Sequence, residues 1–101
     1  MTEHTRLPLH TRRVLLDILR RFPAIEAVWL FGSRARGSAR EGSDIDLVVS
    51  APTMSEADFA RLWDAIDGSP IAFKVDLLHW ERLDNPTLRA QIQQDRVQIY
   101  P

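Results

Sequence analysis

Two neighbouring segments decide the fold of this chain: Leu30-Phe31-Gly32-Ser33 and Ser43-Asp44-Ile45-Asp46-Leu47-Val48-Val49. The first ends an apolar strand with a glycine and a serine, and about ten residues later the second opens an apolar strand with two aspartates. Residues two apart in a strand point to the same face. The carboxylates of Asp44 and Asp46 are therefore expected on one face, while the aliphatic residues pack on the other.

A third aspartate, Asp76, interrupts the apolar run Phe73-Lys74-Val75-Asp76-Leu77-Leu78. A carboxylate among apolar strand residues needs a partner or a metal ion, because burying an unpaired charge costs free energy. Mg²⁺ suits such oxygen-only clusters and takes its remaining ligands from water and phosphates. Asp44, Asp46 and Asp76 together predict a site in which two metal ions clamp a polyphosphate.

Gly32 and Ser33 predict the turn that holds those phosphates. A glycine between a strand and a helix lets backbone N–H groups approach an anion, and the helix N-terminus adds its positive end. Each signal has an ordinary explanation by itself. Serine is a preferred helix N-cap, and the Asp44–Asp46 pair could be two unrelated acids on a solvated strand edge. The combination of the turn, the paired acids and the third acid favours a single site.

Hydrophobic spacing predicts alternating helices and strands, and hence a single α/β domain. The expected strands are Ile25–Phe31, which is apolar on both faces and so central, Asp44–Ser50, Ile71–Trp80 and a short edge strand at Val97–Tyr100. The expected helices are Leu9–Phe22, a short one from Ser33 to about Arg36, one from Ser55 to Gly68, and one that begins at Asn85-Pro86. Residues 37–43 are expected to form a loop.

Composition limits the class of protein. The chain has 101 residues, 45% of them hydrophobic, a net charge of −1 and no cysteine. One small domain is expected, and disulfides and thiolate metal sites are excluded. The charge gives no basic field, so nucleic acid is not favoured as a partner. No segment has the length of a membrane span and the first residues contain no apolar signal, so we expect a soluble cytoplasmic protein without a membrane partner.

The run from Leu30 to Gly37, followed by Ser43 to Leu47, resembles the signature of the DNA polymerase beta-like nucleotidyltransferase superfamily. The small size and the Ser-Arg-Ala-Arg-Gly wording are most similar to its minimal nucleotidyltransferases, the MNT proteins. The resemblance covers nearly all of residues 1–101. It implies a small mixed β-sheet flanked by helices, in an α/β (α+β) domain that transfers a nucleoside monophosphate from an NTP.

The resemblance also implies roles for individual residues. Gly32 and Ser33 would bind the β- and γ-phosphates of ATP, Asp44 and Asp46 would ligate Mg²⁺, and Asp76 would complete one metal site and help to deprotonate the attacking hydroxyl. Arg34 and Arg36 follow the turn. They could neutralise phosphate charge, or they could form an ordinary solvated basic face.

In the MNT family the small proteins often pair with a HEPN-domain ribonuclease toxin and block it by transferring AMP to one of its tyrosines. The resemblance thus implies an adenylyltransferase antitoxin in a hetero-oligomer with its toxin. One alternative is an antitoxin that acts by complex formation alone. Another is a transferase that acts on an RNA 3′ end or a small molecule, although a chain this short shows no acceptor domain.

The remaining aromatic and histidine residues are expected to be structural. Phe59, Trp63 and Trp29 lie on apolar stripes typical of a core. His79 lies three residues after Asp76, on the opposite strand face, and so is not expected to be catalytic.

Overall fold

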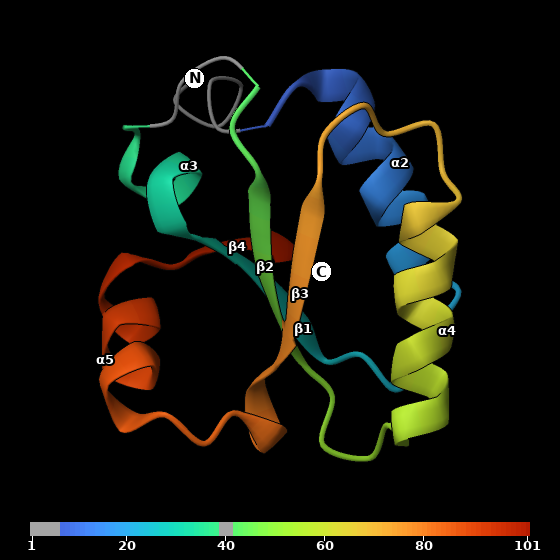
Figure 1. The fold of residues 1–101 in the computed structure, drawn as a ribbon. Coiled ribbons are helices and arrows are strands. Elements are labelled where there is room, and N and C mark those ends of the chain that lie inside the picture. The colour runs from blue at the N-terminus through green and yellow to red at the C-terminus, as the bar shows by residue number, and fades with distance from the viewer. Residues whose placement is uncertain (1–6, 39–41) are drawn as a thin grey trace.

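The computed structural model describes residues 7–38 and 42–101, which form a four-stranded sheet with helices on both sides (Figure 1). Along the chain the elements are α2 (Leu9–Leu19), β1 (Ala27–Phe31), α3 (Gly32–Arg36), β2 (Ile45–Ser50), α4 (Glu56–Asp67), β3 (Val75–His79), the 3₁₀ turn η1 (Trp80–Arg82), α5 (Pro86–Asp95) and β4 (Val97–Tyr100). The predictions for residues 1–6, and for residues 39–41 of the expected loop, concern residues outside the described part of the chain.

The strand order is β3-β2-β1-β4, with β2 and β3 parallel and both other pairs antiparallel. The expected mixed sheet is therefore confirmed. β1 lies inside the sheet and β4 at its edge, as the apolar pattern of the first and the short length of the second predicted. β3 forms the other edge.

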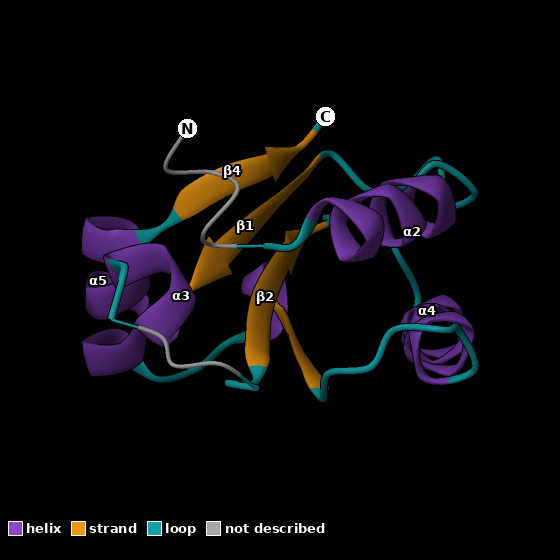
Figure 2. Ribbon diagram, turned by 90° about the horizontal axis from the view of Figure 1, so that it is seen from above, coloured by secondary structure: helices purple, strands orange, loops and turns teal. Residues whose placement is uncertain are grey.

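The two faces of the sheet differ in character. One face, here called the core face, carries Leu30, Leu47 and Leu77, which pack with buried residues of α2 and α4. The other, here called the second face, carries Trp29 with its partner Val48. Figure 2 shows α2 and α4 together on one side of the sheet, with α3 and α5 on the other.

Helix caps follow the predicted sequence signals. The Ser55 side chain accepts a hydrogen bond of 3.1 Å from the Asp58 N–H at the start of α4. The Asn85 side chain accepts one of 3.0 Å from the Leu88 N–H, and Pro86 follows as the first residue of α5. Such side chains satisfy N–H groups that have no partner inside the helix.

Several predicted boundaries were too wide. α2 ends at Leu19 rather than Phe22. β2 begins at Ile45, so Asp44 precedes the strand. β3 begins at Val75 rather than Ile71, because an edge strand can form backbone hydrogen bonds only as far as its single neighbouring strand extends. The first of these bonds runs from the Ile45 N–H to the Lys74 carbonyl, at 2.8 Å. Within residues 7–38 and 42–101, no helix is long and apolar enough to cross a membrane.

Candidate active site

The sheet brings together the aspartates that lie far apart in sequence. β2 and β3 run parallel, and Asp46 is the register partner of Asp76. Partners in register project to the same face, so both carboxylates lie on the second face, at the same end of the sheet. Asp44 lies just before β2 at that end.

Gly32 lies directly beside these acids. β1 runs antiparallel to β2 and pairs its last residue, Phe31, with Asp46, so the turn after β1 reaches the start of β2. Gly32 has a φ of +75°, and a Cβ at this position would lie 2.5 Å from the Asp46 Oδ2 atom. Glycine adopts this backbone conformation without strain, whereas any side chain here would be strained and would have to displace the Asp46 carboxylate.

Ser33 does not cap the short helix that it enters. The N-cap of α3 is Phe31, and no side-chain hydrogen bond caps this helix. The explanation of Gly32-Ser33 as an ordinary serine cap is therefore wrong. The Ser33 carbonyl accepts a hydrogen bond of 2.9 Å from the Ser38 N–H, which closes the turn after α3.

The electrostatics of Asp46 favour a bound cation. Its pKa is raised above the ordinary value, first by partial burial and then by the negative charges of Asp76 and Asp44, while Arg34 and Arg36 lower it. Carboxylates that disfavour each other's charge attract a cation, and the oxygen-only donor set fits Mg²⁺. Within residues 7–38 and 42–101, however, no group of three or more Asp, Glu, His or Cys residues is arranged so that it could hold a metal ion.

Arg34 supports the loop that carries Asp44. Its side chain is only 5% exposed. Its guanidinium donates to the Ser43 carbonyl at 2.6 and 3.1 Å and to the Asp44 carbonyl at 3.3 Å. Burial lowers the pKa of Arg34, and the nearby carboxylates of Asp44 and Asp46 act in the opposite direction. A solvated basic face is thus wrong for Arg34, and its support of the Asp44 loop was missed because its partners are backbone carbonyls.

Arg36 has the solvent exposure expected of a solvated basic face, whereas Trp29 lies outside the core in which it was expected. Arg36 is exposed and lies 3.6 Å from the carboxylate of Asp95 on α5. Phe59 and Trp63 pack against the core as expected. Trp29 instead lies on the second face, where the guanidinium of Arg96 stands 4.4 Å from its ring centre.

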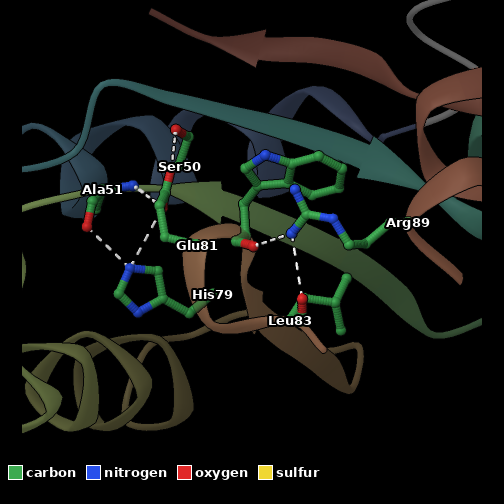
Figure 3. Close-up of polar contacts among 7 residues, drawn as sticks. Ser50, Ala51, His79, Glu81, Leu83 and Arg89 are labelled. Atoms are coloured by element: carbon green, nitrogen blue, oxygen red, sulfur yellow. Dashed lines mark hydrogen bonds and ion pairs between the residues drawn. The ribbon is translucent and has the colours of Figure 1, made fainter. Parts of the chain in front are cut away.

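His79 belongs to a polar cluster at the other end of β3 (Figure 3). Its Nε2 atom lies 2.9 Å from the Ala51 carbonyl. Glu81 accepts hydrogen bonds from the Ser50 hydroxyl at 2.7 Å and the Ala51 N–H at 2.8 Å. This cluster joins the ends of β2 and β3, and it explains the buried histidine structurally.

α5 is held to the segment after β3. The Arg89 guanidinium stands 3.9 Å from the ring centre of Trp80 and donates to the carbonyls of Trp80 and Leu83 (Figure 3). A cavity of about 130 Å³ opens where α5 faces Gly32 and Arg36. It gives the turn after β1 an open side.

A mixed sheet with a Gly-Ser turn beside aspartates on parallel strands defines the site of a nucleotidyltransferase. Comparison with known proteins agrees. The family described as Polymerase beta, Nucleotidyltransferase matches residues 14–101, and the chain belongs to this family.

Three relatives place the chain within the family. It is 32% identical to "Probable protein adenylyltransferase MntA" of Haemophilus influenzae over 83 residues, covering 79% of this chain and 73% of the relative. A solved "putative minimal nucleotidyltransferase" is 36% identical, with a TM-score of 0.64 and coverage of 85% and 86%. A toxin–antitoxin crystal structure with AMP-PNP is 26% identical, with a TM-score of 0.65 and coverage of 87% and 71%.

Proposed function

We propose that this chain is a Mg²⁺-dependent adenylyltransferase that transfers AMP from ATP to a tyrosine of a partner HEPN-domain toxin and thereby acts as its antitoxin. Residues 1–101 then form one nucleotidyltransferase domain. The observation that carries the proposal is the in-register pairing of Asp46 with Asp76 beside Gly32. The relative named as a protein adenylyltransferase and the toxin–antitoxin structure with an ATP analogue support the reaction and the partner.

Each residue of the site has a role in this reaction. Gly32 and Ser33 bind the β- and γ-phosphates of ATP. Asp44, Asp46 and Asp76 hold Mg²⁺, which when bound neutralises the charge of the polyphosphate. Asp76 accepts the proton of the attacking hydroxyl.

The transfer breaks one bond and forms one. The hydroxyl oxygen of the acceptor bonds to the α-phosphorus, the bond from that phosphorus to the bridging oxygen breaks, and pyrophosphate leaves with the electron pair. The acceptor becomes a phosphodiester of AMP. In this proposal residues 1–101 supply the donor site, and the acceptor hydroxyl belongs to the partner protein.

The proposal is tested with purified protein, Mg²⁺, ATP labelled at the α-phosphate and the toxin encoded beside it. We expect label on a toxin tyrosine with the wild type and none with Asp46→Asn. Asp64→Asn on the exposed side of α4 is the matched control and should label normally. An unlabelled toxin would overturn the proposal, and cells rescued from the toxin by Asp46→Asn would assign neutralisation to complex formation alone.

A further inference from the structure

A second cavity lies at the free edge of the sheet, beyond β3. It has a volume of about 230 Å³. The residues that line it include Trp63, Asp67, Ile71, Phe73, Lys74 and Asp76. A volume of about 150 Å³ accommodates benzene in an apolar cavity, so this open space, whose wall is both apolar and charged and which is here called the β3-edge pocket, has room for one aromatic side chain.

The β3-edge pocket is joined physically to the aspartate site. Asp76 is part of its wall. The ring of Phe73, another wall residue, packs on the guanidinium of Arg34 at 4.7 Å, and Arg34 holds the carbonyls of Ser43 and Asp44. The Lys74 ammonium lies 3.9 Å from the Asp76 Oδ1 atom and adds a cation to the wall.

The order of the strands gives the site a direction. The turn at Gly32 follows β1, Asp46 lies on β2 and Asp76 on β3, in adjacent register across the sheet. In phosphoryl transfer the attacking and leaving oxygens are roughly in line through the phosphorus. If pyrophosphate leaves on the Gly32 side, the attacking oxygen must arrive from the β3 side, where the β3-edge pocket opens.

We propose that the β3-edge pocket receives the acceptor side chain, and that its occupant is the phenol ring of a tyrosine on the partner protein. This inference rests on the function proposed above. The aromatic wall stacks on the ring. The phenol oxygen then lies at the Asp76 end of the pocket, attacks the α-phosphorus and passes its proton to the Asp76 carboxylate, while pyrophosphate leaves toward Gly32. Lys74 attracts the negative charge that develops on the phenol oxygen.

Binding is tested with N-acetyl-L-tyrosinamide as the probe. We follow the indole N–H resonance of Trp63 in the wild-type protein by NMR, with Trp63→Phe used for its assignment. Tyrosinamide should shift this resonance and N-acetyl-L-serinamide should not. The proposal would be overturned if tyrosinamide did not shift the Trp63 resonance. It would also be overturned if AMP-PNP shifted the resonance instead, because the pocket would then hold the base of the donor nucleotide.

Catalysis is tested with two variants on α4. Asp67 lines the pocket from an exposed position, so Asp67→Trp should fill it at little cost to the fold, and Asp64→Trp is the matched control one turn earlier. We expect Asp67→Trp to raise the KM for N-acetyl-L-tyrosinamide about tenfold or more, as loss of apolar pocket contacts does, with the KM for ATP unchanged. Asp64→Trp should behave like the wild type.

The outcomes separate the two proposals. Wild-type transfer that Asp67→Trp leaves unaltered would overturn the acceptor pocket while the proposed function stands. If the wild type labels neither tyrosinamide nor the toxin, the proposed function fails, and the NMR titration alone decides whether the pocket binds a phenol.

Discussion

At the scale of single residues, Gly32 and Asp46 constrain each other. The glycine adopts a left-handed φ, and it has no Cβ, which would lie only 2.5 Å from the Asp46 Oδ2 atom. Burial and the acidic neighbours in turn raise the pKa of the Asp46 carboxylate. The sequence predicted the glycine for its approach to an anion, whereas the structure adds its approach to Asp46.

Gly32→Ala should therefore damage both stability and the site. A left-handed φ costs a non-glycine residue about 1–2 kcal/mol, and the new methyl group must also displace the Asp46 carboxylate. Gly37→Ala is the matched control, because Gly37 has a similar φ of +77° with nothing within 4 Å of its added Cβ. Thermal unfolding should show a loss for both variants, but AMP transfer should be lost only with Gly32→Ala. Equal activity of the two variants would contradict this account.

Asp46→Asn should stabilise the metal-free protein while removing activity. Because its pKa is raised in the fold, the ionised carboxylate opposes folding at neutral pH, and this penalty fades as the pH falls through the raised pKa. Added Mg²⁺ should raise the Tm of the wild type but not of the variant, since a ligand that binds only the folded state stabilises it. Exposed Asp84→Asn should leave both responses at the wild-type level. A lower Tm for metal-free Asp46→Asn would contradict the destabilising effect that burial and the neighbouring acids have on this carboxylate.

At the scale of elements, Arg34 connects helix α3 to the segments that precede strands β2 and β3. Its guanidinium reaches from α3 to the carbonyls before β2 and packs on Phe73 before β3. The sequence predicted most element types and caps here, because hydrophobic periods and cap residues act locally. It placed the start of β3 four residues early, because the length of an edge strand depends on how far its neighbour extends.

Arg34→Lys should loosen the loop that carries Asp44. A lysine cannot reproduce the forked donors of a guanidinium, and a hydrogen bond from a charged donor contributes about 1.5–3 kcal/mol. We expect a lower free energy of unfolding in urea and a reduced kcat for AMP transfer. Arg13→Lys, on the exposed side of α2, is the control and should change neither. Wild-type stability of Arg34→Lys would argue against this support.

At the scale of the whole molecule, the two ends of the parallel strand pair serve different purposes. One end carries the aspartates beside Gly32, and the other is closed by Glu81 and His79. Hydrogen bonds join the strands at the closed end, and the function proposed above places the ligands at the charged end. Helices α2 and α4 cover one face of the sheet, and α3 and α5 lie on the other (Figure 2).

Glu81→Ala should lower stability without altering the site. The change removes the acceptor for the Ser50 hydroxyl and the Ala51 N–H, which costs about 1–3 kcal/mol when the donors stay buried. Thermal unfolding measures the loss, and the Tm increase caused by Mg²⁺ should match that of the wild type. Glu26→Ala at an exposed position is the control. A weaker Mg²⁺ response in Glu81→Ala would mean that the two ends are coupled.

The element types, the Gly32-Ser33 turn and the two aspartates, one just before β2 and one within it, followed from the sequence alone, because strand alternation and turn chemistry act over a few residues. The folded structure was needed to show that Asp76 pairs with Asp46, that Arg34 holds the Asp44 loop and that a cavity opens beyond β3. These contacts depend on strand order and register, which arise from packing between segments distant in the chain. The local pattern therefore indicated the class of reaction, while the folded sheet brought the residues of the candidate site together.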